Sequence, residues 1–599
     1  MKTQIVQHDM REAECGLKRS PVFRNTAQEE VRRFVLSYGT VQDCLFLCLV
    51  VLFSLILYVQ DLGFYGDDWS FLGFLSMSSD QSLIGLFRSI YSPYVRMRPV
   101  QILYLAGLYW LFGPHPFGYH LVNAAVLLSN AVLFYLVLRE LGQRRVLSLA
   151  VPVVYALLPH YSTDRFWVAA FQATLSMALY FLSLYSDLRT LRAPLARLWG
   201  WKLLSVLSLI GSILTYEVTL PLFFLNLLLV WYRGRKLYGS VPGKRLVRTN
   251  LAILLISNLL VLTPAIVFKA LTTIRLGSQT GLLEHVISIA KRAMALDYSD
   301  YDYGLNFKQA IVVNYGEYGL GLPRIVWRIL RDYPDAAVFA MGGVLGLITF
   351  GYLYHVASKS ESKLLGQTSM LSFIALGLVV FVLGYAIFLT NYNVLFTPTG
   401  IANRTAIAAA VGVALSLVGG LGWVSTLLPS GQSRKGFFCA LVALLCVSGF
   451  LINNTLASFW ATAYRQEKEI LADIYQQFPT LPKGGTLILD GVCPYVGPAI
   501  VFESCWDLAG ALVMHYRDYT LRADVVTPNL EVREDGLYTS LYGAKYRYPY
   551  DKLFVYHFGQ KVARQLTDAE TARRYFQQYN PDLSSGCARG HEGHGVPVF

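Results

Sequence analysis

Apolar stretches of about 18 residues or more recur along the chain, and each is long enough to cross the roughly 30 Å hydrocarbon core of a bilayer. Of the 599 residues, 54% are hydrophobic and only 15% are charged. This composition excludes a disordered chain and does not suit a single soluble domain. The sequence therefore predicts a mainly α, polytopic bundle of membrane helices. We expect about 11 spans, at 41–60, 118–138, 146–160, 168–186, 202–216, 218–232, 250–270, 335–356, 370–390, 404–427 and 437–456.

Basic residues lie on one side of the predicted bundle. They gather in the N-terminal tail, at Arg144 and Arg145, and in the loops 189–202 and 233–248. Positively charged loops of membrane proteins stay in the cytoplasm, so the pattern predicts a cytoplasmic N-terminus and an extracytoplasmic C-terminus. This bias accounts for the net charge of +13, which therefore does not indicate a nucleic-acid partner. The first apolar stretch has no small-residue cleavage site, so we interpret it as a membrane anchor rather than a removed signal peptide.

The stretch from Trp201 to Trp231 has two interpretations. It is nearly continuous in hydrophobicity around Glu217, and so fits either one kinked helix or two short spans. Two spans keep both flanking Arg-rich loops in the cytoplasm, which favours a hairpin. A carboxylate at mid-membrane costs about 2–3 kcal/mol or more, so Glu217 either caps the hairpin turn or faces a water-filled cavity.

The character of the sequence changes after the last predicted span. The expected elements are a helix continuing to Tyr475, strands at 486–489 and 552–558, and a helix at 506–516. Thr567 to Glu570 matches a capping box that opens a final helix. About 140 residues suffice for a small α/β domain with a modest core. We therefore expect a cytoplasmic tail at 1–40, a membrane domain at 41–456 and an extracytoplasmic domain at 457–599.

The cysteines and histidines of the C-terminal region leave two alternatives open. If this region is extracytoplasmic, Cys493 and Cys505 lie in an oxidising compartment, and we weigh a disulfide between them equally against two free thiols. The terminal segment carries His591 and His594 beside Cys587. This group is either a metal site or, as its terminal position favours, part of a disordered end.

Asp67 and Asp68 follow directly after the first predicted span, in the sequence Tyr65-Gly-Asp-Asp-Trp69. The predicted orientation places them outside, at the height of the lipid headgroups, where carboxylates carry a desolvation cost and tend to serve a function. Helix capping is the competing explanation, because acids favour helix N-termini. Capping accounts for one carboxylate better than for two. Neighbours on a helix diverge by about 100°, so the two acids would have separate tasks.

The segment 62–117 is predicted to be a long external loop. Two amphipathic stretches in it, 68–77 and 100–112, predict helices that lie in the interface plane. Arg96 and Arg98 are in this loop, against the positive-inside pattern. They either extend toward lipid headgroups or bind a phosphate, whose oxygens match the planar guanidinium.

Together these motifs resemble a known family. The acidic pair, the two interfacial helices, Arg98-Pro99 before the second of them, and Gly113-Pro-His-Pro-Phe-Gly-Tyr-His120-Leu-Val-Asn123 entering the next span are similar to the GT-C superfamily of integral membrane glycosyltransferases. The likeness is to the branch of protein O-mannosyltransferases, aminoarabinose transferases and bacterial relatives. It covers residues 41 to about 235. Family members commonly carry Asp-Glu or Glu-x-Asp where this chain has Asp67-Asp68.

The resemblance implies an enzyme of the plasma (inner) membrane of a prokaryote. It would transfer a sugar from a polyprenyl-phosphate donor to a lipid, glycan or protein acceptor outside the cytoplasm. Asp67, or in second place Asp68, would act as the general base that deprotonates the acceptor, with inversion at the anomeric carbon. Basic side chains must stabilise the leaving phosphate. The candidates are Arg96, Arg98, Lys269 and Arg404, of which the last two otherwise serve to anchor membrane ends.

Other residues are candidates for lining the same site. Glu217 is the strongest of them, and the weaker candidates are His160, Trp167 and Gln172. The acidic residues of the cluster Asp297-Tyr-Ser-Asp-Tyr-Asp-Tyr303 either bind a divalent metal or sugar hydroxyls, or belong to a solvated loop, which we favour. Their spacing matches no EF-hand, so we assign no metal ligands and no certain cofactor, although a divalent metal stays possible.

Two other classes of function compete with a glycosyltransferase. A transporter or flippase of a lipid-linked saccharide would also be polytopic, but such proteins often contain internal repeats, and we find none. A structural protein of an envelope complex would leave the acid pair without a role.

Overall fold

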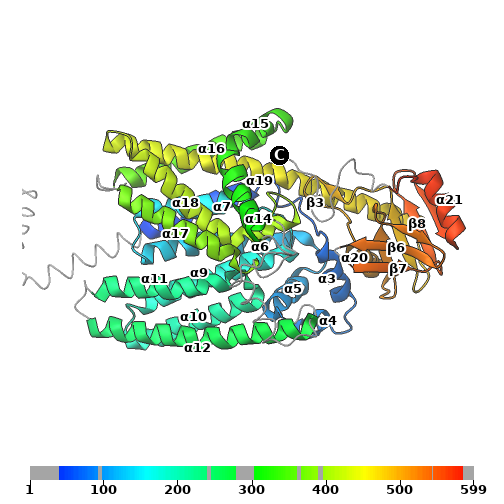
Figure 1. Ribbon diagram of the computed structural model, residues 1–599, viewed down its shortest axis with the longest axis horizontal. Helices are drawn as coiled ribbons and strands as arrows, with labels where there is room; N and C mark the ends of the chain where they lie inside the picture. The colour runs from blue at the N-terminus through cyan, green and yellow to red at the C-terminus, as the bar shows by residue number, and fades with distance from the viewer. Residues whose placement is uncertain are drawn as a thin grey trace, which may run out of the picture.

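The computed structural model describes residues 39–91, 97–238, 244–277, 303–359, 366–388, 396–541 and 544–583. It confirms the expected fold class: a polytopic bundle of helices joined to a small C-terminal α/β region (Figure 1). Several of the predictions concern residues outside the described ranges. These are the N-terminal tail, Arg96, the acids Asp297, Asp300 and Asp302, and the terminal group Cys587, His591 and His594.

Each predicted span falls on a helix. These helices are Gly39–Leu55, α6 (Pro116–Glu140), α7 (Arg145–Leu157), α9 (Gln172–Thr190), α10 (Leu195–Thr215), α11 (Leu220–Tyr238), α12 (Lys244–Gly277), α16 (Ala336–Ser358), α17 (Gln367–Ala386), α18 (Ile407–Ser425) and α19 (Gly431–Gln477). Within the described residues, 7 helices are long and apolar enough to cross a membrane. The chain is a multi-pass membrane protein.

Helices α10 and α11 form a hairpin rather than one kinked helix, as the charge pattern predicts. A single turn of 3-10 helix, η3 (Glu217–Thr219), separates them. Arg233, near the end of α11, lies within electrostatic reach of Arg192, which precedes α10, and of Glu140 at the end of α6. The basic ends of both helices therefore lie on the same side, and Glu217 lies at the opposite end of the hairpin.

A buried polar network ties the first helix to its neighbours. Asp43 is fully buried, and its carboxylate accepts hydrogen bonds from Nε and Nη2 of Arg145 on α7, both at 2.8 Å. The hydroxyls of Tyr135 on α6 and Tyr352 on α16 donate to the same carboxylate, at 2.5 and 2.8 Å. Pairing of this kind offsets the cost of burying a carboxylate. The network therefore fixes four helices at one end of the bundle.

The segment after the first helix contains α3 (Asp67–Ser76), α4 (Leu83–Ile90) and α5 (Pro99–Phe112). Helices α3 and α5 match the two amphipathic stretches that the sequence predicts, and α4 was not expected. The α4 helix begins after Ser82, whose hydroxyl accepts a hydrogen bond from the backbone N–H of Gly85 at 3.2 Å. This is an ordinary N-cap arrangement.

Short helices connect the longer ones on this side of the bundle. Between α7 and α9 lie η1 (Pro159–Tyr161), α8 (Thr163–Phe166) and η2 (Ala169–Phe171). Before α16 lie α14 (Tyr303–Ile311), η4 (Val312–Leu320) and α15 (Leu322–Asp332), and η6 (Ile401–Ala406) precedes α18. Helix α19 has 47 residues and, as predicted, continues out of the bundle into the C-terminal region.

The C-terminal region is built on a four-stranded sheet with the order β4-β1-β8-β9. Strands β4 (Arg522–Val525), β1 (Thr486–Asp490) and β8 (Leu553–His557) are parallel, and β9 (Val562–Leu566) is antiparallel to β8. Two smaller antiparallel sheets are formed by β2 (Tyr495–Val496) with β3 (Ala499–Ile500), and by β5 (Glu531–Arg533), β6 (Gly536–Leu541) and β7 (Ala544–Tyr548). The helices are α20 (Cys505–Tyr516) and α21 (Ala569–Tyr579).

In this region the structure decides one alternative that the sequence left open and corrects one local prediction. Cys493 is disulfide-bonded, but Cys505 is a free thiol, so the two are not paired with each other. The capping box before α21 begins one residue later than predicted. Its N-cap is Asp568, whose carboxylate accepts the N–H of Thr571 at 2.8 Å while the Thr571 hydroxyl accepts the N–H of Asp568.

Helices α3 and α20 pack against each other where the bundle meets the C-terminal region (Figure 1). Their backbones are in contact. A Cβ atom on Gly510 of α20 would lie 2.4 Å from the carbonyl oxygen of Trp69, and one on Gly73 of α3 would lie 3.0 Å from the carbonyl oxygen of Gly510. Only glycine permits so close an approach. The helix that begins with Asp67 is therefore held between the two parts of the chain.

Candidate functional site

The turn before α3 is tightly enclosed. Gly66 has a φ of 48°, in the left-handed region that favours glycine. A Cβ atom there would lie 3.2 Å from the side chain of Ile500, in the C-terminal region, and 3.5 Å from the indole of Trp167. The turn before α3 is thus in contact with the membrane bundle on one side and with the C-terminal region on the other.

Asp68 is buried and is held by the backbone. Its carboxylate accepts hydrogen bonds from the N–H groups of Tyr65, at 3.0 Å, and Ala169, at 2.7 Å, and from that of Val168. Burial raises the pKa of Asp68 well above its usual range, and these backbone donors work in the opposite direction. The side chain joins the start of α3 to the segment between α8 and η2, which is a structural role.

Asp67 has different surroundings. It is only partly buried, and the indole N–H of Trp506, in the C-terminal region, donates a hydrogen bond to its carboxylate. Burial raises the pKa of Asp67, while the nearby guanidinium of Arg404 and the Trp506 indole lower it. Asp67 is therefore the carboxylate of the pair that faces other side chains and does not bind the backbone.

Arg404, on η6, lies at the centre of this group. Its guanidinium is 5.0 Å from the centre of the Trp167 ring, and it acts electrostatically on Asp67, on Tyr216 and on Asp164. Within the described residues, no hydrogen bond or ion pair engages this guanidinium. It is therefore a fixed positive charge with donors available for a ligand.

The loop that carries Arg404 is anchored by its neighbour Asn403. The Asn403 side chain donates hydrogen bonds to the carbonyl oxygens of His160, at 2.8 Å, and Pro398, at 2.7 Å. Its own oxygen accepts hydrogen bonds from the hydroxyl of Ser162 and the N–H of Thr163, both at 3.2 Å. The position of Arg404 is consequently set by the segment between α7 and α8.

Arg98 and Glu217, predicted as a phosphate ligand and a cavity-lining residue, bind each other. Nη2 of Arg98 lies 2.6 Å from Oε1 of Glu217, and Nε lies 3.2 Å from Oε2. The Arg98 guanidinium also lies 4.4 Å from the centre of the Tyr216 ring. Tyr216 is thus within reach of both Arg98 and Arg404, and it connects this ion pair to the surroundings of Asp67.

The other predicted residues are less directly connected to the acid pair. The Trp167 indole N–H donates to the carbonyl oxygen of Tyr65 at 2.8 Å, so Trp167 touches both the turn before α3 and Arg404. Nε2 of His160 is bonded to the carbonyl oxygen of Asn314 at 2.9 Å, in a buried position. Gln172 is buried at the start of α9. The side chain of Lys269, on α12, lies outside the part of the chain that the structure describes.

Two residues that interact with Asp67 or with Arg404 were not predicted from the sequence. Asp164 is fully buried, and neither of its carboxyl oxygens has a hydrogen-bond partner among the described residues. Burial raises the pKa of Asp164 well above its usual range, and Arg404 lowers it. An Asp-Arg pair, Asp164-Arg165, in an otherwise apolar segment was the signal that could have revealed it. Trp506 offered no comparable signal, because its partner lies more than 400 residues earlier in the chain.

The described residues contain no group of three or more His, Cys, Asp or Glu side chains arranged to hold a metal ion. Asp67 and Asp164 are two carboxylates that share the charge of Arg404. The described part of the site is thus organised around a guanidinium.

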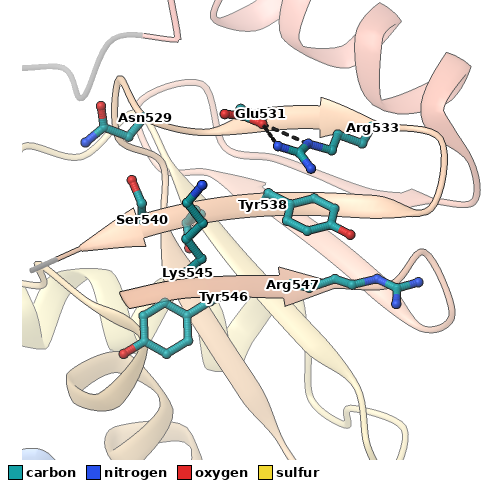
Figure 2. A pocket seen from close by; sticks show the side chains of 9 residues that line it. Asn529, Glu531, Arg533, Tyr538, Ser540, Lys545, Tyr546 and Arg547 are labelled. Atoms are coloured by element: carbon teal, nitrogen blue, oxygen red, sulfur yellow. Dashed lines mark hydrogen bonds and ion pairs between the residues drawn. The ribbon is translucent and has the colours of Figure 1, made fainter. Parts of the chain in front are cut away.

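A shallow depression of about 130 Å³ lies on the exposed face of the β5–β6–β7 sheet (Figure 2). Its arginines already have partners. Arg533 is bonded to Glu531 and lies 4.4 Å from the centre of the Tyr538 ring, and Arg547 pairs with Asp535 at 3.1 Å. These exposed ion pairs are typical of a solvated surface and contribute little to stability.

Comparisons with known proteins give a structural likeness only. No family model matches the sequence, and no curated protein matches it. Two similar solved structures are crystal structures of ArnT from Cupriavidus metallidurans. The one bound to undecaprenyl phosphate has 15% sequence identity and a TM-score of 0.36, over 79% of this chain and 84% of that chain. The one in the apo state has 15% identity and a TM-score of 0.33, over 82% and 85%.

Proposed function

We propose that this membrane protein is a glycosyltransferase that moves a sugar from a polyprenyl-phosphate donor to an acceptor outside the cytoplasm. The observation that carries the proposal is the juxtaposition of Asp67 and Arg404 at one end of a membrane bundle. A carboxylate can take a proton from an acceptor, and a guanidinium free of hydrogen bonds and ion pairs within the described residues can bind a phosphate. Glycosyl transfer from a lipid phosphate requires both groups.

In this proposal Asp67 is the general base. The acceptor hydroxyl or amine gives its proton to Asp67 while its oxygen or nitrogen bonds to the anomeric carbon of the donor. The bond between that carbon and the phosphate oxygen breaks at the same time, and polyprenyl phosphate leaves. Because attack and departure occur on opposite faces of the sugar, the anomeric configuration inverts. A raised pKa suits a base that operates near neutral pH.

Arg404 binds the leaving phosphate. Charge develops on the phosphate oxygens as the bond to the sugar breaks, and a pre-positioned cation stabilises this charge. The anchoring of Asn403 to the carbonyl oxygen of His160 supports the role, because a fixed cation needs no reorganisation during the reaction. Arg98 is neutralised by Glu217, so its part is to hold Tyr216 and the rim of the site. Arg96 and Lys269 stay candidates for further phosphate contacts.

The orientation of the chain is part of the proposal. Arg192, which precedes α10, and Arg233, near the end of α11, lie at one end of the α10–α11 hairpin, and Glu217 with Arg98 lies at the other. The positive-inside rule then puts the N-terminus in the cytoplasm of a prokaryotic cell and the acid pair, with the region 457–599, outside its plasma membrane. The donor sugar would be presented on that outer surface.

The test is sugar transfer in vitro with the purified protein in detergent or nanodiscs. Synthetic polyprenyl-phosphate donors carrying neutral and amino sugars are incubated with candidate lipid, glycan and peptide acceptors, and release of polyprenyl phosphate is measured. We expect Asp67→Asn to lower kcat at least about 100-fold, as for loss of a general base. Arg404→Gln should lower it comparably, and Arg404→Lys should retain part of the activity, since its charge remains.

Asp61→Asn is the matched control, because Asp61 is an exposed acid close to the same end of the first helix. It should leave transfer unchanged. Full transfer by Asp67→Asn would refute the role of this carboxylate. Binding of the donor without transfer, combined with movement of the lipid between leaflets in vesicles, would favour a flippase instead.

A further inference from the structure

The C-terminal region is clamped to the helix that carries Asp67. At the start of α3, Ile500 lies against Gly66. At its end, Nη1 of Arg517 donates to the carbonyl oxygen of Ser76 at 2.6 Å, and the Tyr519 hydroxyl donates to that of Phe74 at 3.3 Å. With the glycine contact between them, these residues make the C-terminal region touch α3 at its start, middle and end. Any shift of the C-terminal region would therefore move α3.

The first turn of α20 is held rigidly. The fully buried Asp507 carboxylate accepts the backbone N–H groups of Ser504, at 3.2 Å, and of Glu503, at 2.8 Å. Trp506 is the second residue of this capped helix. Its indole is thus carried by a backbone whose position is fixed by several hydrogen bonds, and it reaches across to the carboxylate of Asp67.

We propose that Trp506 is a positioning residue of the site, so that the C-terminal region completes the surroundings of the proposed base. This inference rests on the proposed function. The indole N–H is a donor only, so it binds one oxygen of Asp67 without exchanging a proton with it. In this proposal the other oxygen receives the proton of the acceptor, and the hydrogen bond restricts rotation of the carboxylate. Neither oxygen is taken by the backbone, in contrast to those of Asp68.

The hydrogen bond also has a predictable effect on titration. It stabilises the charged form of Asp67, so it lowers the pKa that burial raises. Removing the indole N–H should therefore raise the pKa of Asp67 further. Transfer requires the deprotonated base, so the acidic limb of the pH profile of kcat/KM should move to higher pH by the same amount. KM for the donor should change little, because the hydrogen bond that is removed engages Asp67 and not Arg404, the residue proposed to bind phosphate.

The experiment compares Trp506→Phe with Arg517→Gln in the full chain. Arg517→Gln loosens the same interface but keeps the indole, so it should leave the acidic limb where it is. Because a phenylalanine could alter packing, a second protein carries 3-benzothienylalanine at position 506, in which sulfur replaces the N–H in a ring system of nearly the same shape. The two proteins altered at position 506 should show the shifted acidic limb and a lowered kcat.

A second readout does not depend on turnover. The carboxyl stretch of Asp67 is followed by infrared difference spectroscopy against pH, with Asp67→Asn used to assign the band. One outcome is that the titration midpoint of Asp67 rises in the proteins altered at position 506 while even the unaltered protein shows no transfer. That result would support the hydrogen bond and refute the proposed function. Active proteins with an unshifted pH profile and midpoint would refute the role of Trp506. An equal shift in Arg517→Gln would refute it as well, because interface docking would then be the cause.

Discussion

Asp67 and Asp68 are neighbours with opposite surroundings. Asp68 is satisfied by backbone N–H groups of Tyr65 and Ala169, whereas Asp67 meets Trp506 and Arg404. The sequence predicts that one acid of the pair has a structural task and one a chemical task, and Asp67 was already the preferred base. It could not show which residues surround each acid, because Ala169 and Trp506 approach from distant parts of the chain. Only the folded backbone brings them together.

The two acids should differ in their effect on stability. Asp68→Asn replaces an acceptor of backbone hydrogen bonds with an amide that also carries donors, so we expect it to destabilise the fold by about 1–3 kcal/mol. Asp67→Asn removes a buried charge that is not bonded to the backbone, so it should be neutral or stabilising at pH 7. Thermal unfolding of both variants in the same detergent measures the difference. Equal destabilisation by the two would contradict these roles.

This prediction has a defined pH dependence. Burial raises the pKa of Asp67 in the folded state, so the folded protein binds more protons than the unfolded chain between the two pKa values. Stability therefore falls as pH rises from about 4 through that window. The gain from Asp67→Asn should be present at pH 7 and should vanish below about pH 3, where the carboxyl is protonated in both states.

At the scale of elements, the predictable features are those with a strong periodic or apolar signal. The helices at α3, α5 and α20 and the strands β1 and β8 were expected from their residues. The strands β5, β6 and β7 were not, because they are short and carry exposed charged side chains such as Arg533 and Lys545. Strand propensity in such segments is decided by neighbours in the sheet. The crossing of α3 and α20 also had no signal, since isolated glycines such as Gly73 and Gly510 have many uses.

The crossing of α3 and α20 can be tested with one methyl group. Gly510→Ala would place a Cβ atom 2.4 Å from the carbonyl oxygen of Trp69, so the helices must separate. We expect a loss of about 1–3 kcal/mol and lower transfer activity. Gly107→Ala on α5 is the matched control, because a Cβ atom there meets nothing within 4 Å. Differential scanning fluorimetry reports the stability, and an unaffected Gly510→Ala protein would contradict the close contact.

At the scale of the whole molecule, the positions of the long apolar helices follow from hydrophobicity, and the α10–α11 hairpin follows from loop charge. The polar network around Asp43 was not foreseen, because its partners Arg145 and Tyr352 come from helices far apart in the sequence. Side-chain pairing between helices depends on their rotation and crossing, which apolar runs do not specify.

The Asp43 network should dominate the stability of that end of the bundle. Arg145→Gln leaves a fully buried carboxylate without its cation, and we expect a loss of about 3 kcal/mol. The double variant Asp43→Asn/Arg145→Gln should be more stable than Arg145→Gln alone, because it leaves no unpaired charge. Arg189→Gln removes an exposed pair with Glu140 and should cost less than about 1 kcal/mol. Unfolding in detergent measures the change in stability of each of the three variants. If the effects of Asp43→Asn and Arg145→Gln were additive, the energetic coupling between Asp43 and Arg145 would be contradicted.

Helix α19 sets the distance between the membrane bundle and the sheet of the C-terminal region. Its 47 residues correspond to about 70 Å of uninterrupted helix, at roughly 1.5 Å per residue. One rod thus belongs both to the bundle and to the region with the sheet, and no flexible linker separates them. The sheet is therefore held at a constant distance from the bundle. In the proposed function, an acceptor would have to reach Asp67 between the bundle and the C-terminal region. The fixed distance between these two parts would therefore limit the size of the acceptors that can react.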